Sequence, residues 1–246
     1  MIARVATALL RLAAVAVTGW ALWWRADCAF VYGTCSIRNL AAYFTIESAI
    51  LFGVVALVST VFLARRGPEP AWLTGARTVV TAYVAVSGGV FAVLMGLAGY
   101  TGSEFLVPMS SRILHFVLPA FALVDLLVAP GSPAMSRRQR VALALSALVF
   151  PLGWTVFTSI RGVLTDWYPY FFISPIAAGG IGAVIGYCCA LAVLLVAVVL
   201  SVDALRRSSS SGFVQVSVAN PQFSDGNLDK ADRAERQERW RSSGPE

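Results

Sequence analysis

His115 is the only histidine among the 246 residues of the chain, and it lies in an apolar segment, Ser110–Pro130, that is long enough to cross a membrane. The same segment holds Asp125. Ionisable side chains inside a bilayer are energetically costly, so each one indicates either a partner or a function. An imidazole is the side chain best suited to exchange a proton near neutral pH. The structural alternative is a kinked helix in which His115 bonds a neighbouring helix.

Pro119 follows His115 by four residues. A proline has no N–H group to donate to the carbonyl four residues earlier, which here belongs to His115. We therefore predict that the helix bends beside the imidazole and leaves an unpaired backbone acceptor there. Asp125 would lie about 15 Å further along the helix. That is too far to orient His115, so we interpret Asp125 as structural.

The composition is that of a membrane protein. Hydrophobic residues make up 58% of the chain and charged residues 13%, which excludes an ordinary soluble domain. Six apolar segments each reach the length needed to span hydrocarbon, and they are approximately Val5–Trp24, Asn39–Leu63, Thr78–Gly99, Ser110–Pro130, Val141–Ile160 and Ile176–Leu200. We predict an all-α polytopic integral membrane protein, with a six-helix transmembrane domain over 1–205 and a polar, mostly disordered tail over 206–246.

The arginines in the connections between apolar segments alternate between two sides. One side holds Arg4, Arg65, Arg66, Arg77, Arg137, Arg138, Arg140, Arg206 and Arg207, and the other holds Arg25, Arg38, Arg112 and Arg161. The positive-inside rule then predicts that both termini are cytoplasmic. Because the formal charge of +6 is spread over these connections, we expect no nucleic-acid partner. Arg11, inside the first span, is expected to extend toward its starting side.

Cys28 and Cys35 bracket the first outward-facing loop. In an oxidising compartment the expected state is a disulfide, and the alternative is a pair of free thiols. Four cysteines and one histidine leave too few ligands for most structural zinc sites. We therefore expect neither a metal nor a cofactor.

Glycine and proline positions predict two further features of the spans. Gly88, Ala92 and Gly96 recur at four-residue steps, which is typical of a close contact with another helix. Pro151 lies within the fifth span and predicts a bend there.

Thr45 and His115 are predicted at similar depths. Thr45 lies about 10 Å below the outer end of the second span, and His115 lies at a comparable depth in the fourth, which runs the same way. Ser48 shares a helix face with Thr45, whereas Glu47 points roughly the other way. Glu47 must pair with a cation, be protonated or line a wet cavity.

Three stretches of the chain resemble the androgen-inducible six-span membrane hydrolases, and specifically their bacterial branch. They are YFTIESAI around Thr45, ILHFVLPAFALVDLL around His115, and RGVLTDWYPYFFISP from Arg161 onward. The resemblance covers roughly Val5–Val202. Animal members of this family are threonine-dependent hydrolases of fatty acid esters of hydroxy fatty acids. The resemblance therefore implies a catalytic Thr45 and His115, a long-chain fatty acyl ester as substrate, and a location in the bacterial inner membrane.

The chemistry follows from the two side chains. An alkyl hydroxyl is a poor nucleophile and needs an adjacent base, which His115 would supply to Thr45. Water would then hydrolyse the acyl-threonine with the same base. Candidate substrate-binding residues are Ser48, Arg38, Arg112, Arg161, Trp167, Tyr168 and Tyr170. The arginines would hold an anionic lipid head group at the outer mouth; the alternative is that each is a helix-end anchor. The aromatic residues would form either a lid over a lipid-facing pocket or an interfacial anchor.

The sequence thus predicts a lipid-ester hydrolase whose partners are membrane lipids. The alternative is a non-catalytic protein that binds a lipid or stabilises a partner, with Thr45 and His115 simply bonded to each other. A transporter is a third hypothesis, but no inverted repeat is visible and the buried charges are few.

Overall fold

The computed structural model describes residues 2–33, 35–65, 69–98, 107–128 and 135–219. The chain divides into two compact units, Met1–Arg206 and Arg207–Glu246. The predicted loop after Gly99, the proline-containing connection at Pro130 and most of the predicted tail, 220–246, lie outside the described residues.

Within the described residues the chain is helical, and six helical segments are long and apolar enough to cross a membrane. They are α1 (Ile2–Phe30), α3 (Phe44–Ala64), α4 (Ala71–Leu97), α5 with η2 and α6 (Met109–Arg112, Ile113–Val117, Leu118–Val128), α7 with α8 (Arg137–Ser146, Val149–Thr165), and α10 (Ile181–Ala219). Three short helices lie between them: α2 (Ile37–Ala41), η3 (Phe171–Ile173) and α9 (Pro175–Ala178). The predicted all-α polytopic membrane fold is therefore confirmed.

Helix α10 continues to Ala219. The described part of the predicted tail, 206–219, belongs to this helix. The sixth span also begins later than predicted. Gly179 and Gly180 have φ angles of 88° and 120°, which glycine adopts readily, and they separate α9 from α10.

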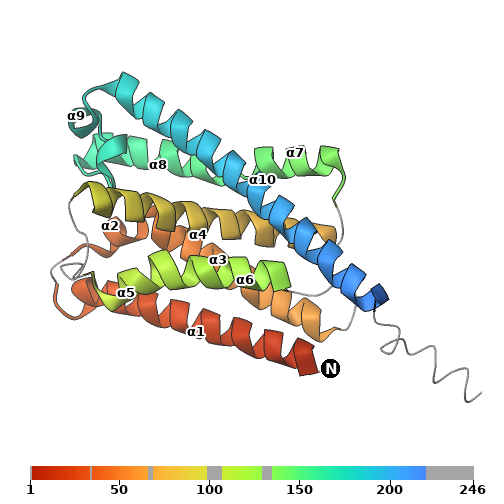
Figure 1. Cartoon of the computed structure of the whole chain (residues 1–246). Helices are drawn as coiled ribbons and strands as arrows, with labels where there is room; N and C mark the ends of the chain where they lie inside the picture. The colour runs from red at the N-terminus through yellow and green to blue at the C-terminus, as the bar shows by residue number, and fades with distance from the viewer. Residues whose placement is uncertain (1, 34, 66–68, 99–106, 129–134, 220–246) are drawn as a thin grey trace, which may run out of the picture. The chain divides into compact units, whose positions relative to one another are not determined.

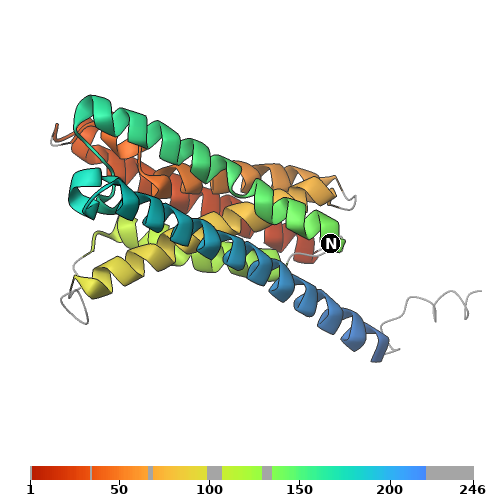
Figure 2. The same cartoon turned by 90° about the horizontal axis from the view of Figure 1, so that it is seen from above.

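The helices of the first unit pack in two groups that share α4. On one side, α1, α3, η2 and α6 pack with α4 around a core that includes Phe52, Val84 and Leu118 (Figure 1). On the other side, α7 and α10 contact α4 through a second cluster that includes Tyr83 and Leu195. Figure 2, a view from above, shows α10 crossing α4 obliquely. Helix α4 therefore lies between the two groups, and it contributes side chains to both clusters.

Pro151 breaks the fifth span as predicted, because α7 ends at Ser146 and α8 begins at Val149. A proline cannot donate to the carbonyl four residues earlier, which here is that of Ala147. The hydroxyl of Tyr83 donates to this oxygen at 2.8 Å. The fifth span thus bends without leaving a buried acceptor unpaired.

The predicted disulfide is also confirmed, since Cys28 and Cys35 are bonded and their Cα atoms lie 5.4 Å apart. The bond closes the loop that joins α1 to α2. We expect thiol-specific alkylation of unreduced protein to leave both residues unmodified. Cys28→Ser is expected to cost about 2–3 kcal/mol, because the closed loop is short. Modification of both thiols in the native, unreduced protein would contradict this assignment.

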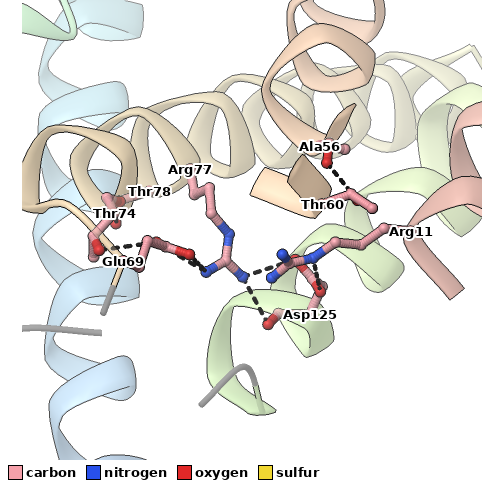
Figure 3. A network of polar contacts seen from close by, with 8 residues as sticks. All are labelled: Arg11, Ala56, Thr60, Glu69, Thr74, Arg77, Thr78 and Asp125. Carbon is pink, nitrogen blue, oxygen red and sulfur yellow. Dashed lines mark hydrogen bonds and ion pairs between the residues drawn. The ribbon is translucent and has the colours of Figure 1, made fainter. Parts of the chain in front are cut away.

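A buried network of charges joins α1, α4 and α6 (Figure 3). Asp125 accepts from Arg11 Nε at 2.8 Å and from Arg77 Nη2 at 2.7 Å. Arg77 also pairs with Glu69 at 3.1 Å, whose carboxylate accepts from the Thr74 hydroxyl. Two cations and two anions are thereby matched, as buried charges require.

Two expectations about this region were wrong. Arg11 does not extend to the membrane surface, since it is 1% exposed and paired with Asp125. Arg77 is not a connection residue, since α4 begins before it and its side chain is 4% exposed. The physical reason is that Asp125 offers each guanidinium a short ion pair inside the bundle, which outweighs snorkelling.

Candidate active site

The structure brings Thr45 and His115 together. Thr45 lies in the first turn of α3 and His115 in η2, and Thr45 Oγ1 lies 3.2 Å from His115 Nε2. This distance is at the long end of the range for a hydrogen bond between a hydroxyl and an imidazole. Two residues 70 positions apart therefore form the contact that a nucleophile and its base need.

The other ring nitrogen of His115 fixes the tautomer. Nδ1 lies 2.9 Å from the backbone oxygen of Ser111. A carbonyl oxygen can only accept, so Nδ1 must carry the proton. In the neutral ring Nε2 is then unprotonated, and its lone pair faces the hydroxyl of Thr45. This arrangement presents the imidazole as a base, and the backbone oxygen of Ser111 orients it.

Ser87 on α4 completes a polar cluster around the threonine. Its Oγ lies 2.7 Å from Thr45 Oγ1. Sequence reasoning missed Ser87, because a serine in a membrane helix usually bonds its own backbone and gives no distinct signal.

The backbone around His115 is irregular. Residues Ile113–Val117 form a π-helical turn directly before Pro119, and such turns are frequent at functional sites. Gly88 of α4 lies against the backbone oxygen of His115, where a Cβ atom would overlap that oxygen. A π-helical turn therefore lies just before Pro119, and α4 approaches it closely because Gly88 has no side chain.

The rest of the predicted small-residue row does not pack. Ala92 and Gly96 are exposed, and a Cβ atom at Gly96 would meet no atom within 4 Å. The contact that the row predicted is confined to Gly88. Phe91, one turn away, instead stacks on the His115 ring with centroids 3.8 Å apart and planes at 18°.

Gly88→Ala should therefore displace His115. The added methyl group would overlap a backbone atom that cannot rotate away, so we expect a loss of about 1–3 kcal/mol in stability and a lower rate of reaction at Thr45. Gly89→Ala is the matched control, because a Cβ atom there meets nothing within 4 Å. Gly89→Ala should be neutral or stabilising. Equal thermal stability and reactivity of the two variants would contradict the described packing.

Thr45, Ser87 and His115 line a cavity of about 170 Å³. Its other walls are mostly apolar and come from α4, α8, η3 and α10, including Phe91, Leu94, Leu148, Leu152, Phe172, Leu191, Ala192 and Leu195. Leu152 on α8 lines the cavity and is itself 58% exposed. An apolar chamber with a few convergent polar groups is typical of a ligand site.

The aromatic loop, Trp167–Tyr170, contributes Tyr170 to the site. The Tyr170 ring lines the cavity and packs edge-on against Tyr43 with centroids 5.5 Å apart. Burial raises the pKa of the Tyr170 phenol, and the nearby Thr45 and the backbone of Phe44 partly oppose that rise. The phenol is therefore protonated at neutral pH.

The remaining predicted residues lie outside the cavity lining. The Ser48 hydroxyl donates to the Thr45 backbone oxygen at 3.1 Å, so it supports the first turn of α3. Arg38 and Arg112 are exposed, and Arg112 Nε donates to the oxygen of Val107.

Arg161, near the end of α8, makes local contacts with the aromatic residues that follow this helix. Arg161 donates to Asn39 Oδ1 and lies over the ring of Trp167, with its guanidinium carbon 4.9 Å from the ring centroid. Tyr168 packs against Gly162. These contacts anchor the aromatic loop, and Tyr170 is the member of the predicted aromatic set that lines the cavity.

Glu47 is partly exposed, and among the described residues its carboxylate forms no ion pair. It lies on the face of α3 away from the Thr45 hydroxyl, as its spacing predicted.

Comparisons with protein-family models, with curated proteins and with solved structures found no match.

Proposed function

We propose that this multi-pass membrane protein is a lipid-ester hydrolase with Thr45 as nucleophile and His115 as base. The observation that carries the proposal is the pair Thr45 Oγ1–His115 Nε2 at 3.2 Å, in a cavity with mostly apolar walls. The resemblance of the segments around Thr45, His115 and Arg161 to the androgen-inducible hydrolases supports the same chemistry.

The first step is acyl transfer to the threonine. Thr45 Oγ attacks the ester carbonyl carbon while its proton moves to His115 Nε2. The resulting imidazolium donates this proton to the departing alcohol, and the acyl group stays on Thr45 as an ester. The hydrogen bond from Nδ1 to the Ser111 oxygen keeps the ring oriented through both transfers.

The second step releases the acid. Water enters in place of the alcohol, gives one proton to Nε2 and attacks the acyl-threonine. The proton then returns to Thr45 Oγ as the carboxylic acid departs. The negative charge that develops on the carbonyl oxygen in each step would be stabilised by the Tyr170 phenol, which lines the cavity.

The substrate would be a long-chain fatty acyl ester from the surrounding membrane. The exposed Leu152 in the cavity wall would give an acyl chain a path from the hydrocarbon without passage through water. We place the protein in the cell membrane, with both termini cytoplasmic and the outer ends of the helices on the oxidising side. The disulfide between Cys28 and Cys35 supports that orientation, and the bacterial resemblance favours the inner membrane.

A non-catalytic lipid-binding protein is the second candidate. The observation that favours it is the completeness of the polar cluster, in which Ser87 and His115 both bond the Thr45 hydroxyl. Such a cluster would be stable without any reaction.

Turnover by the wild-type protein separates these two candidates, and a variant that fills the cavity tests whether turnover takes place there. In Ala192→Trp, an indole occupies cavity space without replacing a polar residue. We expect at least a tenfold fall in hydrolysis of long-chain fluorogenic esters by the purified protein in lipid nanodiscs. Ala190→Trp is the matched control, because Ala190 is exposed on the same helix and should leave hydrolysis unchanged. Binding of the esters by the wild-type protein without any turnover would favour the non-catalytic candidate.

A further inference from the structure

We infer that Ser87 is a positioning residue whose hydroxyl donates to Thr45 Oγ1 and thereby directs the threonine's own proton to His115. This inference rests on the proposed function, because it assigns Ser87 a part in the activation of Thr45. It extends the cluster from two residues to a directed chain of hydrogen bonds that runs from Ser87 through Thr45 and His115 to Ser111.

The direction of the chain follows from counting protons. The Ser111 oxygen accepts, so the neutral ring carries its proton on Nδ1 and has none on Nε2. Nε2 therefore accepts from Thr45 Oγ1. A hydroxyl has one proton, so the proton that lies between Ser87 and Thr45 must come from Ser87.

The shorter contact is the one that orients the nucleophile. Ser87 Oγ lies 2.7 Å from Thr45 Oγ1, whereas His115 Nε2 lies 3.2 Å away. A hydroxyl that accepts a short hydrogen bond has fewer rotational choices for its own proton. As Thr45 loses that proton, the same Ser87 donor faces a growing negative charge, and hydrogen bonds to charged groups are stronger than neutral ones.

The fold holds Ser87 in this position independently of the nucleophile. Ser87 precedes Gly88, whose close contact with the His115 backbone sets the spacing between α4 and η2. Phe91, one turn further along α4, stacks on the His115 ring. Helix α4 thus sets its own distance from η2 through Gly88, holds the His115 ring plane through Phe91 and supplies the Ser87 hydroxyl.

Kinetics of two variants test the role in catalysis. Ser87→Ala removes the donor and should lower kcat about tenfold with little change in KM, because Ser87 acts on the nucleophile rather than on the acyl chain. Ser87→Thr retains the hydroxyl and should recover most of the rate. Unchanged kcat in Ser87→Ala, or equal losses in both variants, would overturn the inference.

A measurement on the imidazole itself tests the chain without any turnover. Because the protein has a single histidine, selective ¹⁵N-histidine labelling in nanodiscs gives one pair of ring nitrogen signals. Wild-type protein should show a protonated Nδ1 and a hydrogen-bonded Nε2. Thr45→Val should move Nε2 to the position of a free acceptor, and Ser87→Ala should move it part of the way.

The two measurements distinguish failure of the inference from failure of the proposed function. An Nε2 signal that moves in Thr45→Val and stays at the wild-type position in Ser87→Ala would overturn the role of Ser87. An Nε2 signal that responds to both variants, in a wild-type protein that hydrolyses no ester, would support the chain of hydrogen bonds and contradict the hydrolase. An unprotonated Nδ1 in the wild-type protein would overturn the direction of the chain.

Discussion

Thr45→Val and His115→Ala are each expected to lower ester hydrolysis by about 10³-fold or more, which is the scale of losses when a nucleophile or its base is removed. The reason is that the attack needs both the hydroxyl and the unprotonated Nε2 that lies 3.2 Å from it. The double variant should be scarcely slower than either single one, because the two residues act as a unit. Steady-state hydrolysis of a long-chain ester by purified protein measures the effect.

Intact structure has to be demonstrated for these variants. Thr45→Val preserves side-chain shape, so a normal elution profile and thermal unfolding midpoint are expected. Glu47→Gln is the matched control in the same helix turn, since its side chain points away from the hydroxyl of Thr45 and should leave hydrolysis near the wild-type rate. Additive losses in the double variant would contradict a nucleophile–base pair.

Asp125→Asn is expected to destabilise the folded protein by about 3–5 kcal/mol, because removing one partner of a buried ion pair leaves charge uncompensated. Arg11 loses its carboxylate partner, and Arg77 keeps the Glu69 carboxylate and the backbone oxygen of residue 125 (Figure 3). The midpoint of unfolding in mixed detergent micelles, followed by circular dichroism, measures the change.

The location of Asp125 makes this effect separable from catalysis. It lies about 15 Å along the helix from His115, so folded Asp125→Asn protein should hydrolyse ester at nearly the wild-type rate per molecule. Glu47→Gln again provides the comparison, because Glu47 forms no ion pair among the described residues. Equal stability of the two variants would contradict the importance of the Arg11–Asp125–Arg77 network.

The fold could be predicted from the sequence because a bilayer imposes one dominant constraint. Each span must be a long apolar helix whose backbone groups bond internally, and the six segments meet that condition in composition and length. Pro119 and Pro151 could also be interpreted locally, since each lacks one donor at a known position. The resulting irregularities appear as the π-helical turn and as the break between α7 and α8.

The partners of the polar residues could not be predicted, because sequence spacing gives depth but not which helices are neighbours. Depth alone placed Thr45 and His115 at the same level, and the fold brings their side chains into contact. The Arg11 side chain was expected to extend toward the starting side of the first span, because the sequence does not show that Asp125, more than a hundred residues away, would lie beside it.

Two contributors to the site had no sequence signal of their own. Ser111 acts through its backbone oxygen, which any residue could supply. Ser87 is one of many hydroxyl residues in the spans, and its role depends on the close approach of α4 at Gly88. Aromatic residues from Trp167 to Tyr170 gave a strong signal as a group, but the fold divides them between anchoring and the cavity wall.

Mapping the nucleophile with a covalent probe tests the central claim most directly. Purified protein in nanodiscs would be reacted with a long-chain fluorophosphonate, digested and analysed by mass spectrometry. The account predicts one adduct, on Thr45, at a rate that falls strongly in His115→Ala and moderately in Ser87→Ala. An adduct on Ser87 or another residue, or no adduct on a protein that hydrolyses esters, would contradict it.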